Sequence, residues 1–422
     1  MKKNRHFYFF IIVLLMLRMT YGLAAEFWEP DEFYTFLLGL KFYSRGLWPY
    51  FGPLVVYTKY QIPGALQAIL TGGPLFLFPI PEAPTVFLNM MTFSSLGLLA
   101  WYFEKRVEGL PGWLIWGLVM TLSWSVQFGT RIINPSYLLV FSILFFIGFF
   151  ETMPLYQKKL ISAGLSFFMM GIAVTCSMQL HLSWILLIPF IIAVLITKAE
   201  NRSLRLTNIV MLGAGGLAGL LTLIPTLLVY GLSGYQNATY LIVFHKDNLL
   251  NFSTILFRFL SFSTFEVQYF AGTPTDRFIE MRLYPWMVPS TLIVLAFSFV
   301  QIAFFIVSFF LKRNQRDWKY VKWISFFSVL LIFLTFFFSE KGPSSHTFYI
   351  LYPVSLFYSM YCYQYIYSKY RHLKFLFIIV LFSGAVFLAG LGCYKYDHKS
   401  LYINRPIVQK AIHDKDYRLI EK

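Results

Sequence analysis

The long stretches without charge are the feature that most constrains how this chain can fold. Many windows of about 18 or more residues are nearly free of charged side chains, which is the length a helix needs to cross the hydrocarbon core of a membrane. Hydrophobic residues make up 58% of the chain and charged residues 13%, against about 45–50% and about 25% in soluble domains. In lipid a backbone must satisfy its own polar groups, as a helix does. We therefore predict an all-α polytopic membrane protein.

The apolar pattern predicts about eleven transmembrane helices. The candidate spans are 7–25, 84–103, 111–130, 135–152, 160–178, 180–197, 207–231, 286–311, 320–338, 347–367 and 373–392. These spans place a transmembrane domain over 1–392 and leave 393–422 as a short external tail. The tail is polar and mixed in charge, so it forms either a small lobe or little structure.

Basic residues set the expected orientation. A net charge of +16 would suggest nucleic acid as the partner of a soluble protein. Here Lys and Arg gather in short loops between spans, which is the positive-inside pattern of membrane proteins. We therefore expect no nucleic-acid partner, a cytoplasmic N-terminus and an external C-terminus. The three cysteines are too few and too scattered for a disulfide framework.

The N-terminus has some features of a signal peptide. A basic start and an apolar run precede Leu23-Ala24-Ala25, which looks like a cleavage site. Arg18 interrupts the run, however, and further spans follow. We expect a retained first helix.

Two long external loops are predicted, over 26–83 and 232–285. Segment 61–80 is apolar enough to span, but a crossing there would invert every later loop, and its prolines break or bend a helix. We expect it to lie on the outer face, so that the first loop carries juxtamembrane helices. In the second loop, 252–270 is apolar but holds Arg258 and Glu266, which favours an interfacial amphipathic helix.

The first loop opens with Trp28-Glu29-Pro30-Asp31-Glu32. Four acidic residues fall within seven positions here, in a chain that uses few charges. Carboxylates next to lipid are costly and usually serve a function. The structural alternative is that Pro30 opens a helix whose first turn favours acidic residues.

Other unusual polar residues also collect at the predicted outer side. They are Lys59, Arg131, Asn134, His181, His245, Lys246, His346 and Tyr349. A carboxylate pair with nearby cations suits an anionic lipid headgroup, because the cations neutralise phosphate and the carboxylate accepts a proton from an attacking hydroxyl or amine. Each also has a structural interpretation: Lys59 snorkels, Arg131 belongs to a turn, and His181 is a satisfied core histidine.

Several of these motifs, in this order, resemble the C-type (GT-C) membrane glycosyltransferases. The first-loop motif, followed by Tyr34 and Gly46-Leu47-Trp48-Pro49, is similar to the first external loop of the lipid A aminoarabinose transferases and the related bacterial protein O-mannosyltransferase-like enzymes. Tyr57-Thr58-Lys59, Arg131 to Pro135, Gln179-Leu180-His181, and His346 to Tyr349 with Pro353 resemble later elements of that family. Two departures are Pro63, which comes late, and Ser136, where an acidic residue is common.

The resemblance implies a transferase that uses a polyprenyl-phosphate sugar donor and a lipid, glycan or protein acceptor. Asp31 would be the catalytic carboxylate and Glu32 its assistant. Where the family uses a divalent cation, Mg²⁺ or Mn²⁺, these two carboxylates would hold it. Lys59, Arg131, His346 and Tyr349 would bind the donor phosphate, and Trp28, Tyr34 and His181 would contact substrate. The implied location is the outer face of a bacterial inner membrane, in cell-envelope lipopolysaccharide or glycan modification.

The main alternative is a non-enzymatic carrier or flippase of a lipid-linked or anionic solute. A carrier should place ionisable residues near mid-membrane, whereas this chain places most of them at the predicted outer end. A polysaccharide polymerase or ligase would share the outer site but would not require the acidic first loop.

Overall fold

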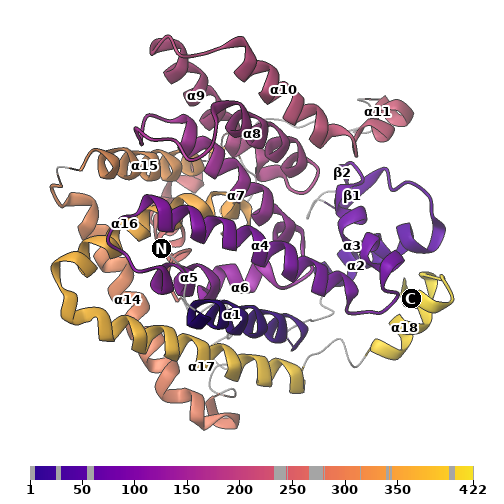
Figure 1. Cartoon of the computed structure of the whole chain (residues 1–422). Helices are drawn as coiled ribbons and strands as arrows, with labels where there is room; N and C mark the ends of the chain where they lie inside the picture. Colours follow the sequence, from indigo (N-terminus) through magenta and orange to yellow (C-terminus); the bar gives the residue numbers. More distant parts are fainter. Residues whose placement is uncertain are drawn as a thin grey trace.

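The computed structural model is a helical bundle with a small lobe at one end (Figure 1). It describes residues 5–24, 30–54, 61–231, 246–265, 281–313, 315–338, 345–398 and 404–421, together with Phe244, Ile279 and Gly342. The lobe, at the right of Figure 1, contains α2, α3, β1 and β2, and α18 lies beside it. Helices α4 and α17 run from this end of the bundle to the other.

Among the described residues, seven helical segments are long and apolar enough to cross a membrane. They are α1 (Arg5–Ala24), α4 (Ala83–Arg106), α7 (Asn134–Thr152), η1 (Leu182–Leu187) with α9 (Ile188–Glu200), η4 (Pro285–Met287) with α14 (Val288–Phe310), α15 (Arg316–Phe336) and α17 (Lys374–His398). An eighth forms if α10 (Leu206–Leu220) and α11 (Ile224–Tyr230), bent by 69°, count as one. The all-α, multi-pass membrane character is thus supported.

Three predicted spans correspond to helices outside that set. They contain α5 (Gly112–Thr121) with α6 (Ser123–Gly129), α8 (Ala163–Met178), and η5 (Ser345–Leu351) with α16 (Tyr352–Lys369). A short 3-10 turn, η6 (Arg371–Leu373), precedes α17. Every predicted span therefore coincides with helical structure, but the count of eleven crossings stays a prediction.

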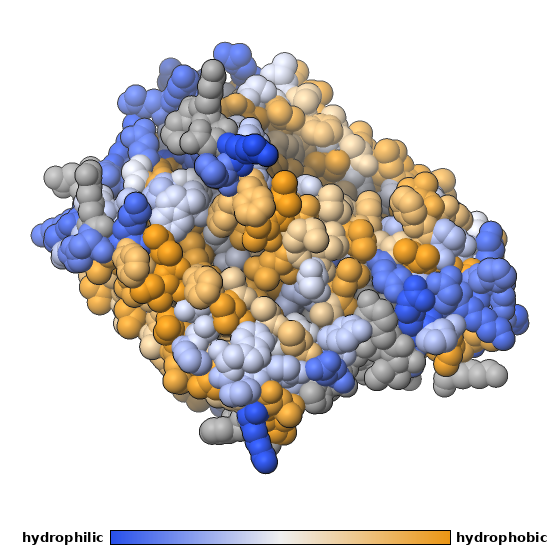
Figure 2. All heavy atoms as spheres, turned by 60° about the horizontal axis from the view of Figure 1, so that its bottom comes forward, coloured by the Kyte–Doolittle hydropathy of each residue, from blue (hydrophilic) through white to orange (hydrophobic). Residues whose placement is uncertain are grey.

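The surface supports a membrane-embedded middle. Figure 2 shows a broad hydrophobic band across the molecule, with hydrophilic residues gathered at its left and right ends. Large apolar side chains are exposed on several of the long helices, among them Ile12, Phe299 and Phe382. Burying such side chains in lipid is favourable, whereas leaving them in water is not.

The first-loop lobe is built from two helices and a hairpin. Helix α2 (Pro30–Arg45) leads to strands β1 (Phe51–Leu54) and β2 (Gln61–Pro63), which pair antiparallel, and then to α3 (Leu66–Leu77). At 12 residues, with Pro74 inside it, α3 is too short to cross a bilayer, which agrees with the expectation that 61–80 does not span.

Glycines allow α2 and α3 to approach closely. A Cβ atom on Gly39 would lie 2.6 Å from the Gly72 nitrogen, so neither position accepts a larger residue without movement. Close approach through small residues recurs between α8 and α10, where a Cβ on Gly171 would lie 2.8 Å from the Gly216 nitrogen. The small-residue stretch Gly213–Gly219 therefore serves helix packing.

The tail folds as part of the lobe. Helices α18 (Arg405–His413) and α19 (Arg418–Glu421) follow α17, and Val408, Ala411 and Ile412 are buried in a cluster with apolar residues of α2 and α3. Arg405 Nε pairs with Glu82 Oε1 at 2.6 Å, and Lys41 with Glu421 at 2.5 Å. Of the two expected alternatives, the small lobe is the one observed.

The second loop contains η3 (Lys246–Asn251) and α12 (Phe252–Ser261). Ile255, Phe259 and Leu260 are buried on one side of α12, while Arg258 is only partly buried. This is the expected amphipathic helix, although it ends at Ser261. The buried side packs against α14, α15 and α16. Glu266 lies outside the described residues.

Arg18 closes a break in the bundle interior. Helix α5 ends at Thr121 and α6 begins at Ser123, so an extended Leu122 interrupts the backbone ladder. The buried Arg18 guanidinium donates to Met120 O and Ser125 O, each at 2.8 Å. Broken helices persist in membranes only where such carbonyls find donors. The charge that interrupts the first apolar run thus fixes α1 in the bundle.

We expect Arg18→Met to lower the stability of the folded protein by about 2–4 kcal/mol, because it leaves two buried carbonyls without their donors. The melting temperature in detergent, followed by size-exclusion chromatography of heated samples, measures the loss. Lys105→Met, which removes an exposed charge from the end of α4, is the matched control. Equal melting temperatures for the two variants would show that the break does not depend on Arg18.

Candidate functional site at the lobe end of the bundle

A buried ion pair joins the lobe to the bundle. Glu32, in the first turn of α2, accepts a hydrogen bond at 2.7 Å from Nε of Arg131, which lies between α6 and α7. Both side chains are nearly enclosed, with 4% and 10% of their surface exposed. The pair is therefore little screened by solvent, and it fixes the start of α2 against the core.

Asp31 faces outward at the same helix turn. Helix α2 begins at Pro30, with Asp31 and Glu32 in its first turn, as the structural alternative for this motif expected. Glu32 turns inward, whereas Asp31 and Tyr34 are exposed. Two adjacent carboxylates thus occupy different environments: one is committed to an ion pair, and the other is accessible from outside.

The Arg131 segment is held by its own backbone contacts. Its carbonyl accepts from the Ser136 hydroxyl at 2.5 Å and from the Ile133 amide at 3.0 Å. Ser136 therefore has a structural use at the position where the resembled family often carries an acid. The Asn134 side chain lies outside the described part of the chain.

Two histidines meet beside these residues. The ring centroids of His181, at the start of η1, and His346, in η5, are 6.5 Å apart with the rings nearly perpendicular. Nδ1 of His181 accepts from the Ser183 amide at 3.1 Å, so neutral His181 carries its proton on Nε2. His346 keeps part of its surface exposed and lies within electrostatic range of Asp31. Asp31, His346 and His181 therefore form a connected polar set.

Both histidines are shifted toward the neutral form. Burial, together with the neighbouring His346, lowers the pKa of His181 to about 4. Loss of hydration also lowers the pKa of His346, while the negative charge of Asp31 opposes that shift. At neutral pH His181 is therefore an uncharged group that donates and accepts hydrogen bonds.

Gln179 ties the site to the hairpin. Its buried amide donates to Gly219 O at 2.8 Å and accepts from the Thr222 hydroxyl at 2.8 Å. Gly64 passes so close that a Cβ there would lie 2.7 Å from the Gln179 side chain, and its φ of +116° also favours glycine. The end of α8, the bend between α10 and α11, and the hairpin are thus fixed together beside His181.

Not every predicted site residue joins this set. Tyr349 is completely buried and its hydroxyl donates to Trp124 O at 3.2 Å, so it belongs to the aromatic core. Trp28, Lys59 and His245 lie outside the described residues. Two further buried polar residues, Gln67 and Thr71, lie one turn apart in α3, and no sequence motif marks them. Both are fully buried, and among the described residues the Gln67 amide has no hydrogen-bond partner.

In the part of the chain that the structure describes, no three His, Cys, Asp or Glu side chains converge as a metal site requires. Glu32 gives one carboxylate oxygen to Arg131, which reduces its value as a cation ligand. The binding of Mg²⁺ or Mn²⁺ by Asp31 and Glu32 stays a prediction.

Comparison of the chain with protein-family models, curated proteins and solved structures found no match.

We expect stability to fall as the pH drops from about 6.5 toward about 4. Unfolded His181 takes up a proton in this range while folded His181 stays neutral, so acid favours the unfolded chain, by up to about 3 kcal/mol. Melting temperatures across this range would be compared for wild type and His181→Asn, which keeps the cap acceptor. The control is His413→Asn, an exposed histidine. If His181→Asn lost stability in acid as much as wild type does, His181 would not be the source of the acid sensitivity.

We expect Glu32→Gln to destabilise the protein by about 3–5 kcal/mol, because it leaves the Arg131 charge buried without its counter-ion. Adding Arg131→Gln should recover part of the loss. Glu421→Gln removes an acid from the exposed pair with Lys41 and should cost at most about 1 kcal/mol. Denaturant or thermal unfolding in detergent measures all three. Arg131→Gln alone is measured as well, and a double variant whose loss equals or exceeds the sum of the two single losses would argue against direct pairing.

Proposed function

We propose that the protein is a membrane glycosyltransferase that moves a sugar from a polyprenyl-phosphate donor to an envelope acceptor. The observation that carries the proposal is that the two adjacent carboxylates in the first turn of α2 have different environments. Glu32 is held by Arg131 inside the protein, and this leaves Asp31 exposed beside His346. An accessible carboxylate on a fixed helix turn is suited to accept a proton.

The proposed reaction is a single displacement. The acceptor hydroxyl or amine attacks the anomeric carbon of the sugar, and its proton passes to the Asp31 carboxylate. The bond between that carbon and the phosphate oxygen breaks, and polyprenyl phosphate leaves with the electron pair. Negative charge grows on the departing phosphate, so nearby donors accelerate the step.

We assign the donors for that phosphate to His346 and Lys59, the latter outside the described residues. Arg131 contributes positive charge, but its Nε is engaged with Glu32, so we propose that it mainly positions α2. Tyr349 is left out because its hydroxyl already serves the core. His181 and Tyr34 are proposed to contact the sugar or the acceptor from either side of Asp31.

The proposed location is the outer face of a bacterial cytoplasmic membrane. The site lies at the start of α2, at the end of the bundle that carries α18. The positive-inside pattern supports a cytoplasmic N-terminus and an external lobe and tail. A site at headgroup level would reach both a lipid-linked donor and an external acceptor.

One observation favours the carrier alternative. Arg18 is a fully buried cation next to the break between α5 and α6, and broken helices with interior charges are typical of transporters. Its donors, however, are directed at backbone carbonyls and the Ser125 hydroxyl, which gives it a structural role.

We expect Asp31→Asn to reduce sugar transfer by at least about a hundredfold, the scale for loss of a general base. Asparagine keeps the shape but cannot take the proton. Purified protein would be assayed with radiolabelled polyprenyl-phosphate sugars and envelope extracts as acceptors. Asp414→Asn, an exposed acid in the tail, is the matched control and should retain activity.

Three outcomes separate the hypotheses. Loss in Asp31→Asn alone supports the assigned base. Full activity in Asp31→Asn keeps the enzyme but overturns its site. No transfer by wild type from any donor would favour the carrier, and lipid-flipping assays would then decide.

A further inference from the structure

A second feature lies on the side of the bundle, away from the lobe. A groove of about 830 Å³ runs between α15 on one side and α7 and α9 on the other. Its walls are almost entirely apolar, with Phe149 and Phe190 on the bundle side and Trp323, Phe327 and Leu334 on α15. Among the described residues, the charged ones that line it are Arg316 and Lys319, both in the first turn of α15.

The groove opens to the side. Phe327 and Leu334 are 58% and 48% exposed, whereas Phe149 and Phe190 are buried and form the floor. Lining residues extend along α15 from Arg316 to Leu334, about 27 Å of helix at 1.5 Å per residue. That length matches most of the hydrocarbon thickness of a bilayer. An elongated apolar chain would therefore fit the groove along its length.

The cations lie at one end of this groove, where a headgroup would be. Both Arg316 and Lys319 are exposed. Lys159 lies close to the same end, since its Nζ donates to the carbonyl of the lining residue Met153 at 2.7 Å. Asp317, next to Arg316, is the acid nearest to these cations on α15, and it does not line the groove. The excess of positive charge selects an anion.

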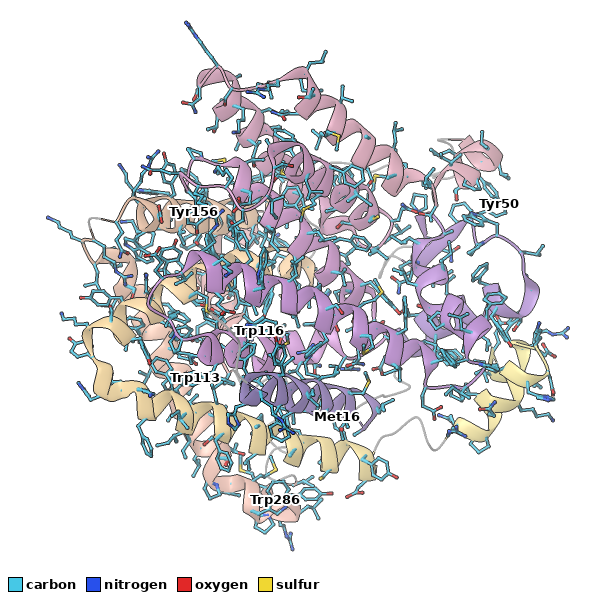
Figure 3. The ribbon with its side chains drawn as sticks, in the orientation of Figure 1. Met16, Tyr50, Trp113, Trp116, Tyr156 and Trp286 are labelled. Atoms are coloured by element: carbon cyan, nitrogen blue, oxygen red, sulfur yellow. The ribbon has the colours of Figure 1, made fainter. Side chains whose placement is uncertain are left out.

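The surrounding structure makes this end rigid. Glu151 pairs with Arg106 and accepts from the Tyr102 hydroxyl at 2.9 Å, so the ends of α4 and α7 are clamped together. The Arg106 guanidinium also lies 4.1 Å from the centre of the Tyr156 ring. Figure 3 labels Tyr156 on the left, far from Tyr50 at the lobe end. The groove is thus built on a fixed wall and lies away from Asp31.

We propose that this groove binds an anionic phospholipid of the surrounding bilayer, with its acyl chain along α15 and its phosphate between Arg316 and Lys319. An apolar helix of a partner protein would fill the same slot, but it would leave the two cations without a counter-charge. Charge and shape together favour the lipid. This proposal does not depend on the glycosyltransferase assignment.

The test uses purified full-length protein, stripped of lipid, and native mass spectrometry with added phosphatidylglycerol or phosphatidylcholine of identical chains. We expect phosphatidylglycerol to remain bound at least about tenfold more tightly, roughly 1.4 kcal/mol. Arg316→Ala with Lys319→Ala should remove that preference. Lys374→Ala, in another basic cluster at the start of α17, should leave it intact.

A second pair of variants tests the groove itself. Ala193→Trp fills the lined space, whereas Ile192→Trp adds the same side chain at an exposed neighbouring position outside the groove. Both variants keep the two cations. Loss of the bound lipid in Ala193→Trp alone supports the site. Equal binding of the two lipids by wild type, or equal binding by both tryptophan variants, would overturn it. Displacement by inorganic phosphate alone would show a simple anion site and also overturn it.

Discussion

The buried pair of Glu32 and Arg131 is the interaction on which the arrangement at the lobe end depends. It joins residues 99 positions apart, and so couples the first turn of α2 to the entrance of α7. Two further contacts complete the attachment: the glycine crossing of α2 over α3, and the Gln179 amide that holds the bend after α10. These buried contacts hold the first turn of α2 in place. They therefore fix the orientation of the exposed Asp31, which its own contacts would not do.

Much of this fold follows from hydropathy and helix-breaking residues. Charge-free windows predicted where the helices lie, because lipid leaves a backbone no alternative, and charge parity together with the prolines of 61–80 argued against a further crossing there. The break at Leu122 could not be predicted, since neither glycine nor proline marks it. The one sequence feature connected with this break is Arg18. In the sequence it only interrupts the apolar run of α1, and its link to the break appears once its acceptors, Met120 O and Ser125 O, are known. The docking of α18 was equally hidden, although Val408, Ala411 and Ile412 have helical spacing.

The candidate site was only partly predictable for a related reason. Sequence could gather Asp31, Glu32, Arg131, His181 and His346 at one end of the bundle, because topology sorts polar residues by side. It could not say that Glu32 would turn inward and Asp31 outward, since adjacent residues of a helix differ by about 100° and only packing decides which is buried. Tyr349 illustrates the same difficulty. It lies one helical turn after the exposed His346, yet it is completely buried.

The packing of α18 against α2 has a consequence for how the protein is made. Residues 30–77 are synthesised long before residues 405–417, yet the latter cover part of the apolar side of α2. During translation that surface stays uncovered by α18 while the intervening helices are made. The lobe is therefore complete only after α18 has been made, and deleting residues 405–417 would disturb the packing of residues 30–77.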